Sequence, residues 1–236
     1  MNQPDRLPEL RVDAERNRTQ IVEAARAAFA ERGIDVPMHD IARQAGVGVG
    51  TLYRRFPTRG ALIAGVFEEK MRTYAEGVET ALADPDPWAG FCGYVERLCL
   101  MQSTDRGFSE VLTLAFPTAK VFEAARRRAY SGFKNLIARA KASGSLRQDF
   151  APEDLIMLLV ANAGVLAATS DAAPRMSPRL VAYLLEAFAA PSHSELPAPP
   201  SPRQTHRALL RLEENRTESG TVGTRLRNPD SSVAAQ

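Results

Sequence analysis

Basic and hydroxyl-bearing side chains gather in one short stretch near the start of the sequence. Residues 41–60 hold four arginines and no aspartate or glutamate: Arg43, Arg54, Arg55 and Arg59. Such a stretch can neutralise phosphates even though the formal net charge of the whole chain is only +2. Thr51 and Tyr53 add hydroxyl groups between the arginines. These residue types indicate contacts with a nucleic acid.

The residues that must position these arginines have the spacing of a helix-turn-helix. Two short helices are predicted, at about 38–45 and 49–55, and Gly46 between them tolerates the positive φ of a tight turn. Small and apolar residues favour a close crossing with a shared seam: Ile41, Ala42, Ala45, Val47 and Leu52, continued by Phe56. In such a unit the second helix lies in the major groove.

The early residues of the second helix are expected to face base edges. Thr51 can hydrogen-bond a base, Val49 can touch a thymine methyl group, and two glycines permit close backbone approach. Because few of these side chains read bases, we expect DNA shape and phosphate contacts to contribute as well. The predicted DNA contacts are Pro37, Met38, Val47, Gly48, Val49, Gly50, Thr51, Tyr53, Arg54, Arg55 and Arg59.

Residues 13–70 resemble the DNA-binding domain of the TetR (tetracycline repressor) family. The resemblance is carried by Ile-x-x-Ala-Ala at 21–25, Phe29-x-x-x-Gly33, Ile41-Ala42-x-x-Ala45-Gly46-Val47, Gly50-Thr51-Leu52-Tyr53, Phe56-Pro57 and Ala61-Leu62. It implies a three-helix DNA-binding domain joined to a larger helical domain that binds a small molecule and forms the dimer. The family's usual role is repression relieved by the ligand.

The rest of the chain also favours helices, so an all-α fold of about nine helices is predicted. Apolar periodicity and Pro or Gly punctuation divide the chain into four parts. We expect a disordered arm at 1–12, the helix-turn-helix domain at 13–58, a ligand-binding and dimerisation domain at 59–190, and a disordered Pro-rich tail at 191–236. Within the tail, the sequence allows a transient helix over residues 203–216, carrying Leu209, Leu210 and Leu212. Thr58 is expected to cap the helix that starts the larger domain.

A ligand pocket is expected among the middle helices, because pockets of helical domains are mostly apolar. The candidates are Phe91, Val95, Cys99, Phe108, Leu112, Phe116, Phe122, Tyr130, Phe133 and Met157. Plain hydrophobic core is the alternative for each of them. The helix at about 118–143 has seven basic residues against one glutamate, which indicates either a solvated face or a partner for an anion.

The apolar helices at about 153–170 and 178–190 are assigned to a homodimer interface, on the strength of the resemblance. Small residues there allow close approach to a symmetry mate. The candidates are Leu155, Leu158, Ala161, Gly164, Val165, Leu180, Leu184 and Phe188, with an intramolecular core as the alternative.

No cofactor, metal site or membrane partner is expected. The N-terminus lacks a signal peptide, the apolar run at 155–168 is interrupted and short for a bilayer, and a cytoplasmic location follows as the default. Cys92 and Cys99 are interpreted as core thiols, with pocket or redox roles as the alternative. The three histidines support no catalytic or metal arrangement.

The predicted function is therefore that of a dimeric repressor released from a palindromic operator when a small molecule binds. An enzyme is the main rival class, and no nucleophile, phosphate-loop or metal motif favours it. A binder of DNA without sequence preference stays open because of Val49 and its flanking glycines. Activation stays open as well, since sequence cannot separate it from repression.

Overall fold

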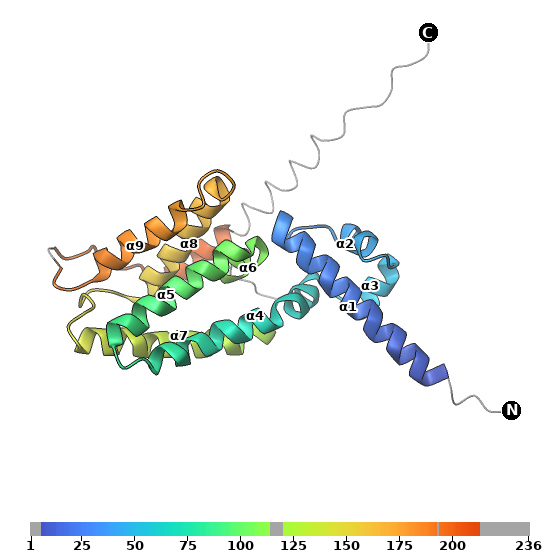
Figure 1. The fold of residues 1–236 in the computed structure, drawn as a ribbon, viewed down its shortest axis with the longest axis horizontal. Coiled ribbons are helices and arrows are strands. Elements are labelled where there is room, and N and C mark those ends of the chain that lie inside the picture. Colours follow the sequence, from blue (N-terminus) through green and yellow to red (C-terminus); the bar gives the residue numbers. More distant parts are fainter. Residues whose placement is uncertain (1–5, 114–119, 193, 213–236) are drawn as a thin grey trace, which may run out of the picture.

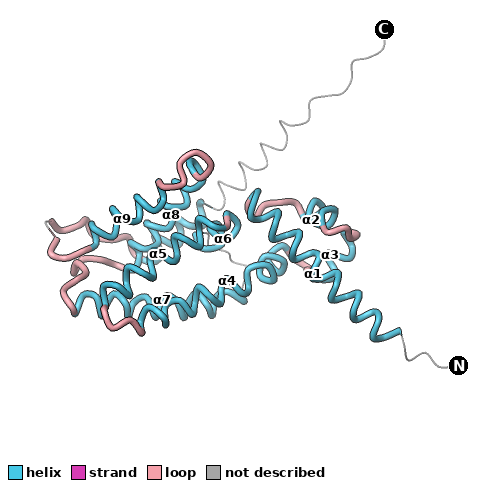
Figure 2. Tube along the Cα trace, viewed as in Figure 1, coloured by secondary structure: helices cyan, strands magenta, loops and turns pink. Residues whose placement is uncertain are grey.

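The described parts of the chain, residues 6–113, 120–192 and 194–212 of a computed structural model, are built from helices joined by short loops (Figures 1 and 2). The helices of the main body are α1 Arg6–Arg32, α2 Met38–Gln44, α3 Val49–Arg55, α4 Arg59–Leu82, α5 Pro87–Thr104, α6 Arg106–Thr113, α7 Lys120–Ala142, α8 Pro152–Thr169 and α9 Met176–Phe188. A further helical segment, the tail helix, covers residues 202–212. The predicted all-α fold is confirmed.

Helical structure is found near both ends of the described residues. Helix α1 begins at Arg6 instead of about Asp13, so the prediction of a loose arm is wrong for residues 6–12. In the Pro-rich tail, residues 202–212 form the tail helix, where the sequence indicates a transient helix over residues 203–216. Residues 1–5 and 213–236 lie outside the described residues.

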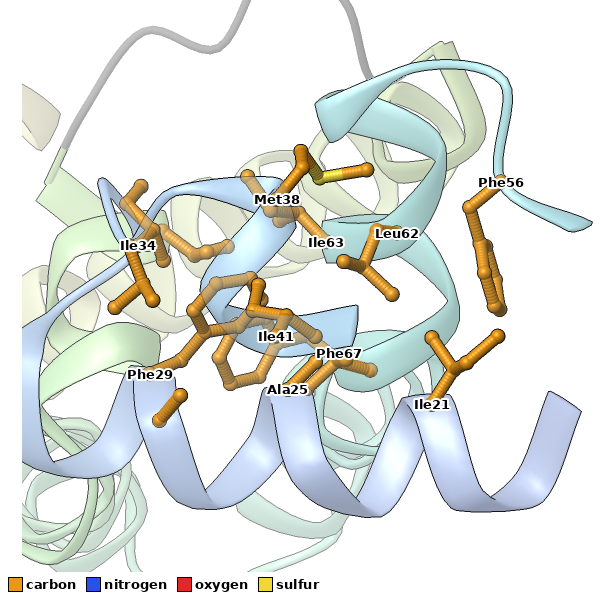
Figure 3. Close-up of a cluster of buried hydrophobic side chains, with 14 of the residues drawn as sticks. Ile21, Ala25, Phe29, Ile34, Met38, Ile41, Phe56, Leu62, Ile63 and Phe67 are labelled. Carbon is orange, nitrogen blue, oxygen red and sulfur yellow. The ribbon is translucent and has the colours of Figure 1, made fainter. Parts of the chain in front are cut away.

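Helices α1 to α3 gather at one end of the molecule, and α4 leads from them into the larger helical body (Figure 1). The core of this end is built on Ile21, Ala25 and Phe29, which recur every fourth residue along α1 and are fully buried. Figure 3 shows these side chains facing Ile41 of α2 and Leu62, Ile63 and Phe67 of α4. The same core, which we call the N-terminal core, also includes Phe108 of α6 and Phe122 of α7. This core therefore extends beyond the expected domain boundary at residue 58.

A second core fills the space between α4, α5, α7, α8 and α9. Ring contacts run from Phe133 to Phe91, Phe150 and Phe188 in that order, with centroids 5.9, 5.3 and 4.8 Å apart. Asp86 begins α5, because its carboxylate accepts a hydrogen bond from the Trp88 amide.

Helix α8 carries a buried polar residue in an apolar sequence. The Asn162 amide donates to Gln102 of α5 and accepts from Ser177 of α9, at 2.9 and 2.7 Å. Among the described helices, α8 is long and apolar enough to cross a membrane by length and composition, with 28% of its residues buried. That is weak evidence for a span, since core helices pass the same test. Much of the apolar surface of α8 is left uncovered by the described residues.

Candidate DNA-binding surface and ligand pocket

The turn between α2 and α3 has the geometry that the sequence predicts. Gly46 adopts φ 67°, and the Val47 amide donates to the Ala42 carbonyl at 3.0 Å across the turn. Gly48 then starts α3 with extended backbone, and Leu52 anchors the helix because its side chain is fully buried. The opposite face of α3 consequently points to solvent.

The exposed face of α3 presents few side chains that can read bases. Val49 and Tyr53 are 42% and 47% exposed, and Gly48 and Gly50 are exposed backbone. Thr51 is half-buried, and its hydroxyl lies 3.5 Å from the Arg54 guanidinium. Pro37 is also exposed, at the start of α2.

The four arginines of the basic stretch differ in what they contact. Arg54 and Arg55 are exposed at the end of α3. Arg43 pairs at 2.8 Å with Asp40, which lies just before the stretch and reduces its positive charge. The Arg59 guanidinium donates to the carbonyls of Ile34 and Val36, at 2.7 and 2.8 Å, and so ties the start of α4 to the α1–α2 turn. The Nη1 group of Arg59 therefore donates within the protein, and its phosphate contact stays a prediction.

Two further predicted DNA contacts have side chains in the interior. Met38 is 7% exposed and lies among the buried side chains of the N-terminal core in Figure 3. Val47 is half-buried and packs against the same core. Met38 is the first residue of α2 and Val47 lies in the turn before α3, and both side chains contact the core that the two helices share. The exposed surface that remains is Pro37, Gly48, Val49, Gly50, Tyr53, Arg54 and Arg55, which we call the α3 face.

Thr58 caps α4 as predicted. Its hydroxyl accepts a hydrogen bond from the Ala61 amide at 3.0 Å. The cap fixes the start of α4 at Arg59, three residues after Phe56, whose side chain packs into the N-terminal core.

Helix α6 connects the α1–α2 turn to the larger domain. The Glu110 carboxylate accepts a hydrogen bond from the Ile34 amide at 2.8 Å. The buried Asp105 carboxylate accepts from the Phe108 amide at the start of α6 and pairs with Lys70 of α4 at 2.5 Å. At the other end, Arg126 of α7 donates to the Val111 carbonyl at 2.6 Å. Any movement of α6 would therefore reach both α1 and α4.

A cavity of about 680 Å³ lies between α4, α5, α6, α7, α8 and the tail helix. This size is within the range of small-molecule sites. Of the residues predicted for a pocket, Leu112, Tyr130 and Phe133 line it. The other described residues that line it were not predicted as pocket residues: Tyr74, Tyr94, Thr113, Glu123, Arg126, Arg127, Ala129, Pro152, Leu155, Ile156, Leu159, His206, Leu209 and Leu210.

The other pocket candidates are corrected by their burial. Phe91, Val95 and Cys99 belong to the second core, and Phe108 and Phe122 to the N-terminal core. These side chains have less than 5% of their surface exposed and do not line the cavity. Met157 is 60% exposed on α8, and Phe116 lies outside the described residues.

The cavity wall is mostly apolar, with polar groups in two places. Tyr74 of α4 and Tyr94 of α5 are linked by a side-chain hydrogen bond. Burial raises the pKa of both phenols, and the nearby Arg126 charge offsets only part of this rise at Tyr74, so both stay protonated. Arg126, Arg127 and Glu123 form the second polar place on α7, where Arg127 lies 3.6 Å from Glu123.

Both cysteines are unreactive by environment. Cys99 is buried and Cys92 is half-buried, and burial raises the pKa of each thiol to about 12. Neither cysteine lines the cavity. Their placement is that of core thiols.

The residues predicted for the dimer interface divide into two groups. Leu155, Leu158 and Phe188 are buried in the core of their own chain, and Leu155 also lines the cavity. Ala161 and Gly164 are exposed on α8, and a Cβ added at Gly164 would meet nothing within 4 Å. Val165, Leu180 and Leu184 are half-buried. Two exposed side chains that the prediction omitted, Met157 and Tyr183, lie on the same two helices.

Two family models match the chain. Residues 21–66 match the model of bacterial regulatory proteins of the tetR family. Residues 86–187 match the C-terminal domain of SbtR-like transcriptional regulators.

Relatives and solved structures resemble the chain over different lengths. An HTH-type transcriptional regulator of Staphylococcus aureus is 38% identical over 66 residues, which are 28% of this chain and 36% of that protein. The chain thus spans about a third of the length of the curated relatives it matches. The crystal structure of a TetR transcription regulatory protein from Mycobacterium vanbaalenii is 30% identical, with 77% of this chain and 99% of that chain covered and a TM-score of 0.46. FadR from Bacillus subtilis, solved in complex with stearoyl-CoA, is 18% identical, with 74% and 99% covered and a TM-score of 0.54.

Proposed function

The chain belongs to the TetR family of bacterial regulatory proteins, and we propose that it is a dimeric repressor that releases an operator when a small molecule fills its cavity. The observation that carries this proposal is the α3 face, whose exposed arginines and backbone are presented by a buried leucine and a tight glycine turn. The site of action is the cytoplasm, where such a regulator meets the chromosome.

The α3 face supports binding in the major groove. Arg54 and Arg55 supply two phosphate contacts per protomer, and Tyr53 supplies a third polar group beside them. Gly48 and Gly50 have open space where a Cβ would lie, so the backbone of α3 can approach the base edges closely. Val49 then supplies apolar contact with a thymine methyl group. Sequence reading is therefore assigned to shape, methyl contacts and Thr51.

The exposed faces of α8 and α9 support a homodimer. They carry the largest exposed apolar side chains of the larger domain's last two helices: Met157, Met176 and Tyr183, between 48% and 60% exposed. Ala161 and Gly164 between them permit a partner helix to come close. A two-fold pair through these faces would place two α3 helices on one side of a duplex, where half-sites are roughly 34 Å apart.

The cavity supports an apolar effector with an acidic group. Its wall is mostly carbon, while α7 contributes two guanidinium groups against one carboxylate. An acidic group that attracts Arg126 would compete with the Val111 carbonyl for that guanidinium. The end of α6 would then shift, and Glu110 would transmit the shift to the Ile34 amide and the α1–α2 turn. The effector acts only through its preference for one position of α6.

The test is selection of random duplex DNA by the purified protein at near-physiological salt. A palindromic motif with two half-sites about one helical turn apart supports the proposal. Binding that recovers no motif and vanishes as salt rises would contradict sequence-specific regulation and favour a binder without sequence preference. For the switch, equal operator affinity with and without a saturating cavity ligand would contradict release.

A further inference from the structure

The chain beyond α9 is not part of the family resemblance, yet it returns to the cavity. The C-terminal family model ends at residue 187. The tail helix nevertheless places three side chains, His206, Leu209 and Leu210, in the cavity wall. Leu209 and Leu210 are half-buried, while Leu212 on the same helix is 42% exposed. The tail helix is thus amphipathic, and its apolar face is turned to the cavity.

A partly buried ion pair directs the chain back after α9. The Arg147 guanidinium donates to the Asp149 carboxylate at 2.8 Å and to the carbonyls of Ala187 and Ser194, at 3.2 and 2.7 Å. The same carboxylate accepts the Leu196 amide at 2.9 Å. Arg147 is 7% exposed, so these bonds are shielded from water on one side. They hold residues 194–196 against the body, from which a Pro-rich segment leads to the tail helix.

The tail helix has its own start signal. The Ser201 hydroxyl accepts from the Gln204 amide at 3.4 Å, and the Gln204 side chain accepts from the Ser201 amide at 2.8 Å. This reciprocal pair is a capping box, which satisfies amides that the first helical turn leaves without partners. The helix is therefore specified locally and positioned by the cavity wall it covers.

We propose that the tail helix is a lid of the effector site, so that a ligand bound in the cavity is retained beneath Leu209 and Leu210. The proposal rests on the cavity being the effector site. About 680 Å³ stays open with the lid in place, so the lid forms a wall around a ligand and does not fill its space. Removing the apolar face of the lid should therefore accelerate ligand dissociation, with little effect on the fold of the two cores.

The first experiment measures dissociation of a probe from the full chain. The probe is 8-anilinonaphthalene-1-sulfonate, whose apolar rings and single sulfonate fit a carbon-lined cavity with arginines. Leu209→Ser combined with Leu210→Ser should speed its dissociation about tenfold. Leu212→Ser is the matched control, because Leu212 lies on the same helix outside the cavity wall, and it should leave the rate unchanged. Ile156→Trp places a larger ring in the cavity wall and should weaken saturable binding.

The outcomes separate the lid from the cavity. Equal dissociation rates for all the tail variants, with binding still weakened by Ile156→Trp, would overturn the lid and leave the effector site in place. No saturable binding by the unaltered chain would overturn the effector site and the lid with it. Operator selection measures DNA binding independently of either result.

A second experiment tests the lid without a ligand. A cysteine introduced by Leu209→Cys should react with a maleimide about tenfold more slowly than one introduced by Leu212→Cys, because only the first is covered by the cavity wall. The native thiols contribute little, since burial raises the pKa of Cys92 and Cys99 to about 12. Equal labelling rates at the two positions would overturn the lid.

Discussion

The α3 face and the cavity use opposite means to recognise a partner. The α3 face carries two glycines, one valine and a few polar groups, so its specificity depends on where the backbone is held. The cavity is lined by large side chains from five helices and the tail helix, so its specificity depends on the space they leave. The α3 face needs a closely packed core behind it to hold its backbone in place. The cavity, in contrast, is a space that the surrounding core residues leave unfilled. Stability should therefore depend more on the core behind α3.

Truncation of a leucine to alanine should give the largest difference between the two regions in the free energy of unfolding. Leu52→Ala empties a fully closed site behind α3 and should lower the free energy of unfolding by about 3–5 kcal/mol. Leu159→Ala borders the cavity, where part of the neighbouring space is already open, and should cost about 1–2 kcal/mol. Chemical denaturation of both variants measures the difference. Equal losses would show that the cavity wall is packed as tightly as the N-terminal core.

Alanine substitutions at two glycines compare the same regions through the backbone. Gly33 and Gly46 both adopt positive φ, 81° and 67°. A Cβ at Gly46 would meet nothing within 4 Å, so Gly46→Ala should cost only the conformational strain, about 1 kcal/mol. A Cβ at Gly33 would lie 2.5 Å from the Glu110 carboxylate and displace the link between the α1–α2 turn and α6.

Gly33→Ala should therefore cost about 1–2 kcal/mol more than Gly46→Ala and should also weaken the effect of a cavity ligand on operator affinity. Thermal unfolding and operator titrations with and without the ligand measure the two effects. If the two glycine variants behaved alike, Glu110 would not connect α6 to the turn.

The sequence predicts the α3 region well because its determinants are local. Gly46, the buried Leu52 and the Thr58 cap act within a few residues of where they stand, and each takes its predicted place. The inward placement of Met38 and the internal contacts of Arg59 could not be predicted, because they depend on residues of the neighbouring turn and of α4. No local spacing shows that Arg59 would find the Ile34 and Val36 carbonyls.

The cavity is predicted poorly because it is defined by the relative placement of distant segments. Phe91 and Tyr94 lie on the same helix at similar spacing from their neighbours, yet only Tyr94 reaches the cavity. Arg126 and Arg127 line the cavity from α7, and the excess of positive charge on this helix indicates an anion partner as one of two alternatives. Leu209 and Leu210 are visible as an apolar pair in a polar tail, but no local pattern shows that they cover a cavity lined by residues of α4 to α8, far earlier in the sequence.

Among the arginines, the structure predicts unequal contributions to DNA binding. Arg55→Ala removes an exposed guanidinium and should weaken binding to all duplexes by about 1 kcal/mol, with the slope of log affinity against log salt reduced by about one per contact. Arg43→Ala is the matched control, since its guanidinium is already paired with Asp40 and the change should be smaller. Salt titrations of the two variants measure both quantities. A larger loss for Arg43 would reverse the assignment.

Thr51 should behave differently from the arginines. Its hydroxyl is the polar group closest to the start of α3, so Thr51→Ala should weaken selected operators more than random DNA, by less than about 1 kcal/mol. Its contact with Arg54 at 3.5 Å is long and contributes little. Competition between an operator and a scrambled duplex measures the ratio. An even loss across sequences would show that Thr51 acts through Arg54 and the backbone of DNA instead.

The smallest expected effect is the pH dependence of the tail's attachment. Hydrogen bonds from Arg147, and then from the Leu196 amide, hold the pKa of Asp149 well below its usual range. A carboxylate whose pKa is lower in the folded state stabilises the fold fully above its unfolded pKa, and this stabilisation is lost as the pH falls toward the folded pKa. The difference in unfolding temperature between the unaltered chain and Asp149→Asn should thus be constant from about pH 8 to 5 and shrink in more acidic solution. A difference that grew on acidification would show that the carboxylate does not hold the tail through Arg147.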